Sequence, residues 1–139
     1  DLGLAQLGEW AADGFRGQPQ KIGDIGAGHR QGDLGELAQR SREVLESLGI
    51  ENVTVHVRDG TQGFAEAAPF DGIVCGAAGP RVPDPWIEQL ADGGRIVMPV
   101  GSAGAQTLVC VERRGEQVSR RDICPVRFVP LIGEEGWEA

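Results

Sequence analysis

Short apolar runs alternate with helical patterns along this chain, and this alternation restricts the fold more than any other feature of the sequence. The clearest helix is expected over residues 33–48, where apolar side chains recur at intervals of three and four positions on one face. Asp33 is expected to cap its first turn, with Glu36 completing a capping box. Gly49 is expected to end the helix.

The apolar runs are short and bounded by glycine or aspartate, as strands of a parallel sheet commonly are. A second helix is expected over residues 83–90, between the last two runs, with Asp84 as its cap and Pro85 at its first position. The expected strands are residues 21–25, 53–57, 70–75 and 95–100.

The C-terminal part changes pattern, because no helix separates its apolar runs. Residues 107–112 and 117–124 are expected to pair as an antiparallel hairpin, and residues 126–132 form a last extended segment. The sequence therefore predicts an α/β fold: an open sheet, mostly parallel, with an antiparallel C-terminal hairpin. A chain of 139 residues fits one domain, in which residues 1–20 are the least defined part.

The charge and hydropathy of the chain limit the classes of partner and the location that are expected. The net charge is −8, whereas a nucleic-acid-binding surface is usually basic, so no nucleic-acid partner is expected. No apolar run reaches the roughly 18 residues of a membrane span, and no signal peptide is visible, so cytoplasm is the default location. The basic residues gather at the expected hairpin, where they are interpreted as its solvated tip: Arg113, Arg114, Arg120 and Arg121.

The cysteines do not predict a metal site. Cys75, Cys110 and Cys124 lie in or beside apolar runs, and no pair has Cys-x-x-Cys spacing. They are expected to be buried free thiols. His29 and His56 lack the spacing to them that a zinc site needs, so no metal is expected. His56 is interpreted as a surface or packing residue.

Ligand chemistry is expected where the parallel strands end, because open α/β sheets bind ligands at their carboxyl edge. After the first strand, residues 24–28 read Asp-Ile-Gly-Ala-Gly, and such glycines let the backbone approach a ligand closely. After the strand at 53–57 come Asp59 and Gly60, where a carboxylate could accept from an exocyclic amine and an amide could donate to a ring nitrogen. Taken alone, each motif is as consistent with an ordinary turn.

Several stretches together resemble the protein-L-isoaspartate O-methyltransferase family. The most specific are the Phe-Asp strand with the Pro-x-Val-Pro loop that follows it, and the Val-Arg-Phe-Val-Pro segment. The stretches occur in family order between Val53 and Trp137, at residues 59–63, 68–74, 77–83, 89–101 and 125–131. The resemblance implies a Rossmann-like methyltransferase sheet and S-adenosylmethionine as the methyl donor, with S-adenosylhomocysteine as product.

The resemblance also implies where the cofactor binds. Asp59, Gly60 and Thr61 resemble the family's adenine-contacting turn. Residues 22–28 resemble its first motif, with an acidic residue at Asp24 and glycines that would lie against the methionine part. The cofactor-binding residues implied are Asp24, Gly26, Ala27, Gly28, Asp59, Gly60 and Thr61.

The implied reaction is methylation of the α-carboxylate of L-isoaspartyl residues in damaged proteins, after which the ester collapses to a succinimide. That carboxylate is ionised at pH 7, so positioning can replace a strong general base, and no catalytic residue is assigned.

Trp86 and Trp137 are interpreted as packing residues. The protein is expected to act as a monomer. The resemblance also implies that an extended peptide contacts Val82, Pro83, Arg127 and Val129, while Arg127 is equally consistent with packing against its own sheet.

The chain departs from the family pattern after Gly28. The family continues with a helix and a second strand that ends in an acidic residue for the ribose, whereas here His29 leads almost directly into the helix at 33–48. Either the protein is genuinely shorter, or residues of the protein are missing from this sequence between Gly28 and His29. The abrupt join favours the second explanation.

Two other functions compete with this interpretation. The chain could be a non-catalytic relative that keeps the sheet but has lost cofactor affinity, which the missing ribose acid favours. It could also be a nicotinamide-binding domain, which requires a third glycine in its phosphate loop. Gln31 stands at that position, so the second alternative is disfavoured.

Overall fold

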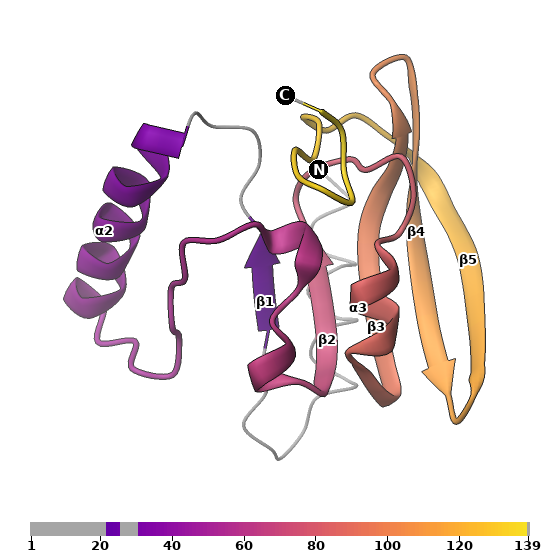
Figure 1. Cartoon of the computed structure of the whole chain (residues 1–139), viewed down its shortest axis with the longest axis horizontal. Helices are drawn as coiled ribbons and strands as arrows, with labels where there is room; N and C mark the ends of the chain where they lie inside the picture. The colour runs from indigo at the N-terminus through magenta and orange to yellow at the C-terminus, as the bar shows by residue number, and fades with distance from the viewer. Residues whose placement is uncertain (1–21, 26–30, 139) are drawn as a thin grey trace.

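The computed structural model describes residues 22–25 and 31–138, and these form a five-stranded sheet with helical segments beside it (Figure 1). The strands lie in the sheet in chain order, so β1 and β5 are its edges. Their bounds are Ile22–Ile25 for β1, Phe70–Cys75 for β2, Leu90–Ser102 for β3, Ala105–Arg114 for β4 and Gln117–Val126 for β5.

The sheet combines parallel and antiparallel pairings. Strand β2 pairs in parallel with β1 and with β3, while β4 pairs antiparallel with both β3 and β5. The expected α/β sheet with an antiparallel C-terminal hairpin is therefore confirmed, but the sheet is not mostly parallel, because two of its four strand pairings are antiparallel. Parallel pairing brings the carboxyl ends of β1 and β2 to one edge, where Ile25 is the register partner of Cys75.

One face of the sheet carries the hydrophobic core. Along β2, Ile73 and Cys75 are buried while Val74 is 49% exposed, so the covered face lies toward α3, Asp84–Glu88 (Figure 1). Trp86 of α3 is fully buried there. Around it pack Phe70, Ile73, Val82, Leu90, Ile96, Met98, Val109, Val111 and Leu131.

Helix α2, Gln31–Ser47, confirms the predicted helix but begins earlier than expected. Asp33 therefore lies within its first turn rather than at its cap, so the capping-box prediction is wrong. The C-terminal prediction is confirmed, because Gly49 has a φ of 69° and its amide donates to Glu46 O at 3.0 Å. The Ile50 amide donates to Leu45 O at 2.9 Å, which completes a Schellman motif.

The apolar face of α2 is largely uncovered in the described structure. Among residues 35–48 only Ala38 is buried, whereas Val44 is 49% and Leu48 66% exposed. Figure 1 shows α2 standing apart from the sheet, on the side of β1. A helix of this amphipathic pattern is normally stabilised by packing of that face, so α2 lacks its usual tertiary support here.

The predicted strand at residues 53–57 is wrong: the segment belongs to no strand. A strand exists only where a neighbouring backbone supplies hydrogen bonds. In a doubly wound sheet the third strand pairs with the second, and this chain has no second-strand segment between Gly28 and His29. The segment lies beside α2 instead, where Arg42 Nη2 donates to Val55 O at 2.9 Å.

Two details of the second helix also differ from expectation. Helix α3 begins at Asp84, so Asp84 is its first residue rather than its cap, and the cap position belongs to Pro83. Pro85 is consequently at the second helical position. Asp84 instead pairs with Arg81 at 3.0 Å. Two short 3₁₀ helices precede β2: η1, Gly60–Gln62, and η2, Ala65–Ala67.

The segment that follows β5 returns to the carboxyl end of β2. The Ala78 amide donates to Val129 O, and the Leu131 amide donates to Ala78 O, both at 2.8 Å. The buried side chain of Gln106 clamps the neighbouring Phe128, since its Nε2 donates to Phe128 O at 3.0 Å and its Oε1 accepts from the Phe128 amide at 2.6 Å. The clamp supplies hydrogen bonds that strand pairing would otherwise provide.

Gln106→Leu is expected to destabilise the protein by about 1–3 kcal/mol, because it leaves the Phe128 amide and carbonyl without their partners at a partly buried position. Urea denaturation measures this change. Gln117→Leu, at an exposed position on β5, is the control and should change stability by less than about 0.5 kcal/mol. Equal effects of the two substitutions would contradict the clamp.

Candidate functional site

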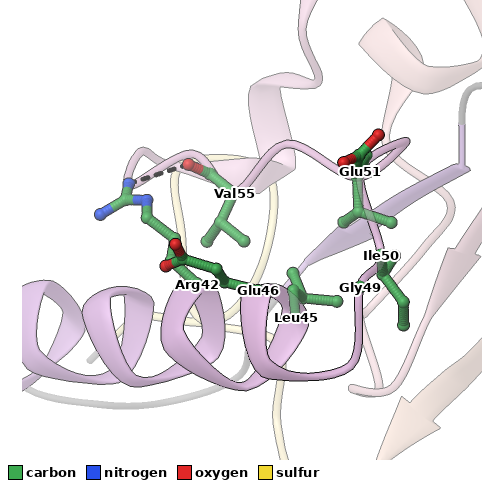
Figure 2. A pocket seen from close by; sticks show the side chains of 8 residues that line it. Arg42, Leu45, Glu46, Gly49, Ile50, Glu51 and Val55 are labelled. Atoms are coloured by element: carbon green, nitrogen blue, oxygen red, sulfur yellow. Dashed lines mark hydrogen bonds between the residues drawn. The ribbon is translucent and has the colours of Figure 1, made fainter.

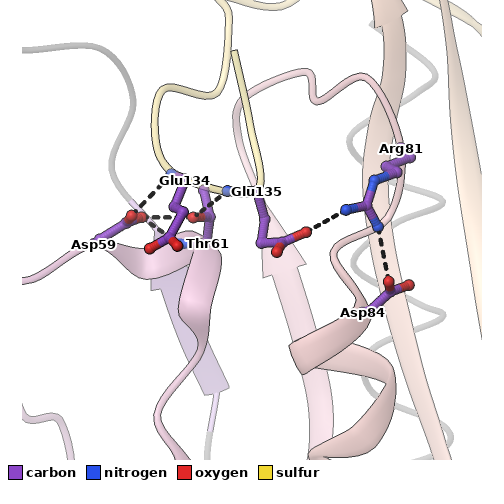
Figure 3. Close-up of polar contacts among 6 residues, drawn as sticks. All are labelled: Asp59, Thr61, Arg81, Asp84, Glu134 and Glu135. Carbon is purple, nitrogen blue, oxygen red and sulfur yellow. Dashed lines mark hydrogen bonds and ion pairs between the residues drawn. The ribbon is translucent and has the colours of Figure 1, made fainter. Parts of the chain in front are cut away.

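The turn that carries Asp59 and Thr61 lies at the carboxyl edge of the parallel strands. It is tied there by the C-terminal turn, residues 133–137, which reaches both this turn and the loop after β2 (Figure 3). On the loop side, Trp137 Nε1 donates to Ala78 O at 3.0 Å. The predicted adenine-contacting turn is thus at the edge where open α/β sheets bind ligands.

The Asp59 carboxylate caps η1 and is extensively hydrogen-bonded. Its Oδ1 accepts from the Thr61 amide at 2.9 Å and from Thr61 Oγ1 at 2.7 Å. Its Oδ2 accepts from the Glu134 amide at 3.0 Å. A carboxylate offers about four acceptor positions, so one position, on Oδ2, is left for a ligand donor.

Gly60 supplies the complementary group. Its carbonyl accepts from Trp86 Nε1 and from the Gly63 amide, each at 2.9 Å. Its own amide is at the first position of η1, where no intrahelical acceptor exists, and it donates to no group in the described part of the chain. An acceptor on Asp59 beside a donor on Gly60 is the pairing that the amine and ring nitrogen of adenine require.

Thr61 has a structural role in this turn. The residue is fully buried, its hydroxyl donates to Asp59 Oδ1, and it accepts from the Glu135 amide at 3.1 Å. Its side chain therefore orients the Asp59 carboxylate. Because Thr61 is buried, it would affect a ligand indirectly, by holding Asp59 in place.

Two residues that the sequence did not assign to the site, Trp86 and Gln89, form hydrogen bonds that hold the turn in place. Gln89, at the end of α3, donates from Nε2 to Gln62 O at 3.1 Å and accepts from the Phe64 amide at 2.8 Å. Trp86 was interpreted as packing, which is confirmed by its burial, and its indole also bonds to Gly60 O. A buried tryptophan usually finds a partner for its N–H, but no sequence pattern identifies that partner.

Burial would raise the pKa of Asp59, but the hydrogen bonds from the Glu134 amide, the Thr61 hydroxyl and the Thr61 amide outweigh it and hold the pKa below 3.8. The carboxylate is therefore ionised at neutral pH. Because the unfolded chain binds this proton more readily than the folded one, Asp59 stabilises the fold above about pH 4, and the contribution disappears as pH falls through the lower folded pKa.

Asp59→Asn is expected to lower the free energy of unfolding by about 1 kcal/mol at pH 6, a small value because solvent screens this exposed carboxylate. The gap between the two proteins should narrow below pH 4, since the wild-type group then becomes protonated. Urea denaturation at pH 3, 4, 5 and 6 measures it. A gap that stays constant over this range would contradict the ionised, hydrogen-bonded carboxylate.

The other predicted cofactor residues are only partly described. Asp24 lies in β1, one residue before its carboxyl end, while Gly26, Ala27 and Gly28 lie outside the described residues. The first motif therefore leads to the same sheet edge as the Asp59 turn, through the pairing of β1 with β2.

The structure separates the predicted substrate residues into two groups. Val82 is 9% exposed and belongs to the core, and Pro83 is also buried, so neither side chain presents much accessible surface. Arg127 and Val129 are exposed. Arg127 lines a hollow of about 370 Å³ together with Gly104, Gln106 and residues 125–126.

A second hollow, of about 210 Å³, lies between α2 and residues 49–55 (Figure 2). It is lined by Arg42, Leu45 and Val55 among others, and none of the predicted ligand-binding residues contributes to it. It occupies the place where the uncovered face of α2 meets the segment that forms no strand.

Among the described residues, no group of three or more His, Cys, Asp or Glu side chains is placed to hold a metal. Cys75 and Cys110 are buried free thiols as expected, and burial raises the pKa of the Cys110 thiol. The same prediction for Cys124 is wrong, because it lies on the exposed strand β5. None of the helices in the described ranges, 22–25 and 31–138, has the length and hydropathy to cross a membrane.

A family model described as protein-L-isoaspartate(D-aspartate) O-methyltransferase matches residues 31–136. Proteins named protein-L-isoaspartate O-methyltransferase are similar: one from Roseiflexus sp. strain RS-1 is 50% identical over 103 residues, covering 74% of this chain and 47% of that protein. Another, numbered 2, from Pelobacter propionicus is 52% identical over 106 residues, covering 75% of this chain and 47% of that protein. The chain thus spans about half the length of the curated relatives it matches.

Solved structures support the fold. A protein-L-isoaspartate O-methyltransferase superposes with a TM-score of 0.69 at 24% identity, covering 83% of this chain and 35% of that one. A Plasmodium falciparum structure, titled as a putative enzyme of this name in complex with S-adenosyl-L-homocysteine, gives 0.62 at 22% identity, covering 80% of this chain and 51% of that one. The family match begins at Gln31, so residues 24–28 lie outside it.

Proposed function

This chain belongs to the protein-L-isoaspartate(D-aspartate) O-methyltransferase family, and we propose that it contributes the adenine-binding part of an enzyme that methylates L-isoaspartyl residues of damaged proteins. The observation that carries the proposal is the family match over residues 31–136, which includes the Asp59–Thr61 turn. Because the chain spans half the length of its relatives, the activity is proposed for the complete protein.

The residues of the turn fit the adenine edge of S-adenosylmethionine. The remaining acceptor position of Asp59 would receive the exocyclic amine, and the Gly60 amide would donate to a ring nitrogen. The low pKa of Asp59 keeps its carboxylate an acceptor at neutral pH. We assign Asp24, Gly26, Ala27 and Gly28 to the methionine part, on the resemblance of residues 22–28 to the family's first motif.

Bound S-adenosylmethionine would supply a sulfonium-activated methyl group. The protein has the task of orientation, since the isoaspartyl carboxylate is already ionised and can attack without a strong base. The rigid Asp59 turn would fix the adenine end, and this would help to fix the methyl group relative to the carboxylate. No described residue needs to move a proton in this step.

We assign the peptide substrate to the exposed residues Arg127 and Val129. The Arg127 guanidinium could pair with a carboxylate of the peptide, while the Val129 side chain would contact it through apolar surface. Val82 and Pro83 would contribute to substrate binding indirectly, since their buried side chains anchor the loop after β2 in the core. The proposed partner is a damaged protein rather than a nucleic acid or a membrane. We propose that the protein binds it as a monomer in the cytoplasm.

Titration calorimetry with S-adenosylhomocysteine tests the proposal directly. The inosine analogue, in which a carbonyl replaces the 6-amine, is the matched control, since its 6-carbonyl cannot donate to Asp59 and its protonated N1 cannot accept from the Gly60 amide. The protein should bind the adenine compound about tenfold or more tightly than the inosine analogue. With S-adenosylmethionine as the methyl donor, the complete protein should methylate an isoaspartyl peptide but not its aspartyl counterpart. Equal affinity for the two ligands would overturn the assignment of Asp59 and Gly60.

A non-catalytic relative remains the second candidate, and the uncovered face of α2 favours it. The intact mass of the purified polypeptide separates the two. A mass clearly above 14.7 kDa would indicate further residues that could complete the cofactor site. A mass of 14.7 kDa without binding of S-adenosylhomocysteine would support the non-catalytic relative.

A further inference from the structure

The C-terminal turn, residues 133–137, closes directly onto the Asp59 turn (Figure 3). Two consecutive amides make the contact, since Glu134 donates to Asp59 Oδ2 at 3.0 Å and Glu135 donates to Thr61 Oγ1 at 3.1 Å. A side chain at Gly133 would not fit, because its Cβ would fall 2.7 Å from Thr61 Oγ1. The two turns therefore pack backbone against side chain, with no space between them.

The C-terminal turn is fixed by its own hydrogen bonds. The Trp137 amide donates to Leu131 O at 2.8 Å, and the Gly136 amide donates to Gly133 O at 3.0 Å. The Trp137 indole is anchored on Ala78. A displacement of this turn would consequently move the amides of Glu134 and Glu135 together relative to Asp59.

One ion pair fastens the turn on its outer side. The Arg81 guanidinium contacts the Glu135 carboxylate and also pairs with Asp84 Oδ2 at 3.0 Å (Figure 3). Arg81 is half exposed, whereas the Glu135 side chain is 25% exposed. The guanidinium thus links the start of α3 to the residue whose amide holds Thr61.

We propose that Arg81 and Glu135 are positioning residues for cofactor recognition: their ion pair holds the C-terminal turn in place, and the turn orients the Asp59 carboxylate toward adenine. The inference rests on the proposed function. Both residues act through the amides of Glu134 and Glu135, since their own side chains point to each other rather than to Asp59.

This role differs from a general contribution to stability. An exposed ion pair contributes little to the free energy of unfolding, so its loss should hardly change the melting temperature. Recognition of adenine is more sensitive, because the strength of a hydrogen bond falls steeply with misalignment. The pair should therefore affect the discrimination between ligands more than the fold.

Glu135→Gln keeps the shape of the side chain and removes its charge. Affinity for S-adenosylhomocysteine should fall about threefold to fivefold, with little change for the inosine analogue. Arg81→Ala should act similarly, and the double variant should lose no more than either single variant. Asp122→Asn is the control, since it breaks the ion pair with Arg120 on the hairpin, where the arginine is as exposed as Arg81 and the carboxylate is more exposed than that of Glu135.

Amide signals of Thr61 and Glu134, recorded by NMR without ligand, provide a second readout that does not need binding. They should shift in Glu135→Gln and in Arg81→Ala but not in Asp122→Asn. Unchanged amide signals, or unchanged discrimination between the two ligands in a protein that binds them, would overturn the positioning role. If the wild-type protein bound neither ligand, both the proposed function and the role in cofactor recognition would fail. Shifted amide signals in Glu135→Gln and Arg81→Ala would then still show that the ion pair positions the C-terminal turn, so the error would lie in the cofactor assignment.

Discussion

Replacing Trp86 with alanine is expected to lower the free energy of unfolding by about 3–5 kcal/mol. Trp86 is fully buried, and it fills the space between α3 and the covered face of the sheet. Its removal leaves a cavity that the surrounding strands cannot close, because β2 and β3 are fixed by their pairing. The substitution also leaves Gly60 O without its donor. Urea denaturation followed by circular dichroism measures the change.

Two further variants separate packing from hydrogen bonding. Trp86→Phe retains most of the apolar volume but loses the bond to Gly60 O, so a smaller loss of about 1–2 kcal/mol is expected. Phe128→Ala truncates an aromatic side chain that is 40% exposed and should cost less than either. A Trp86→Ala effect no larger than that of Phe128→Ala would contradict the central position of Trp86 in the core.

Asp59→Ala is expected to weaken binding of S-adenosylhomocysteine by about tenfold to a hundredfold, because a hydrogen bond to a charged group is lost and the Gly60 amide loses its fixed position. The Thr61 amide and hydroxyl and the Glu134 amide lose their acceptor in the same step. Titration calorimetry measures the affinity. The binding loss should exceed the loss of stability, since the carboxylate is exposed and solvent can replace part of its contacts.

Asp71→Ala is the matched control for this experiment. Asp71 is an exposed aspartate near the opposite end of β2, away from the carboxyl edge of the sheet. Its replacement should leave the affinity unchanged. If Asp59→Ala and Asp71→Ala behaved alike, the adenine assignment would be wrong. Asp59→Asn adds a finer test, because it keeps one oxygen for Thr61 and should give an intermediate affinity.

The strands and turns with strong local signals were predictable from the sequence. Strand β2 has the predicted bounds of residues 70–75, and the hairpin of β4 and β5 contains both predicted segments. The end of α2 at Gly49 was predicted because only the left-handed conformation of glycine satisfies the last carbonyls of the helix so readily. In each case the signal lies in neighbouring residues, so no distant contact was needed.

The candidate site was predictable only in part. The order of the motifs indicated the family and the Asp59 turn, and the family match confirms the first of these. The contacts that shape the turn come from Glu134 and Glu135, which are 75 and 74 positions away from their partners. Both contacts use backbone amides, and every residue except proline has one, so no sequence pattern distinguishes these two.

What the sequence determined by itself was the set of local elements and the motifs that mark the family. The tertiary structure decided which elements found partners. Within the described ranges, residues 53–57 have the pattern of a strand but pair with no other strand, and the apolar face of α2 is largely uncovered. It also decided which predicted ligand residues are accessible, since Val82 and Pro83 are buried while Arg127 and Val129 are exposed. Pairing and burial depend on groups far along the chain, whereas periodicity, capping and turn chemistry depend on groups close by.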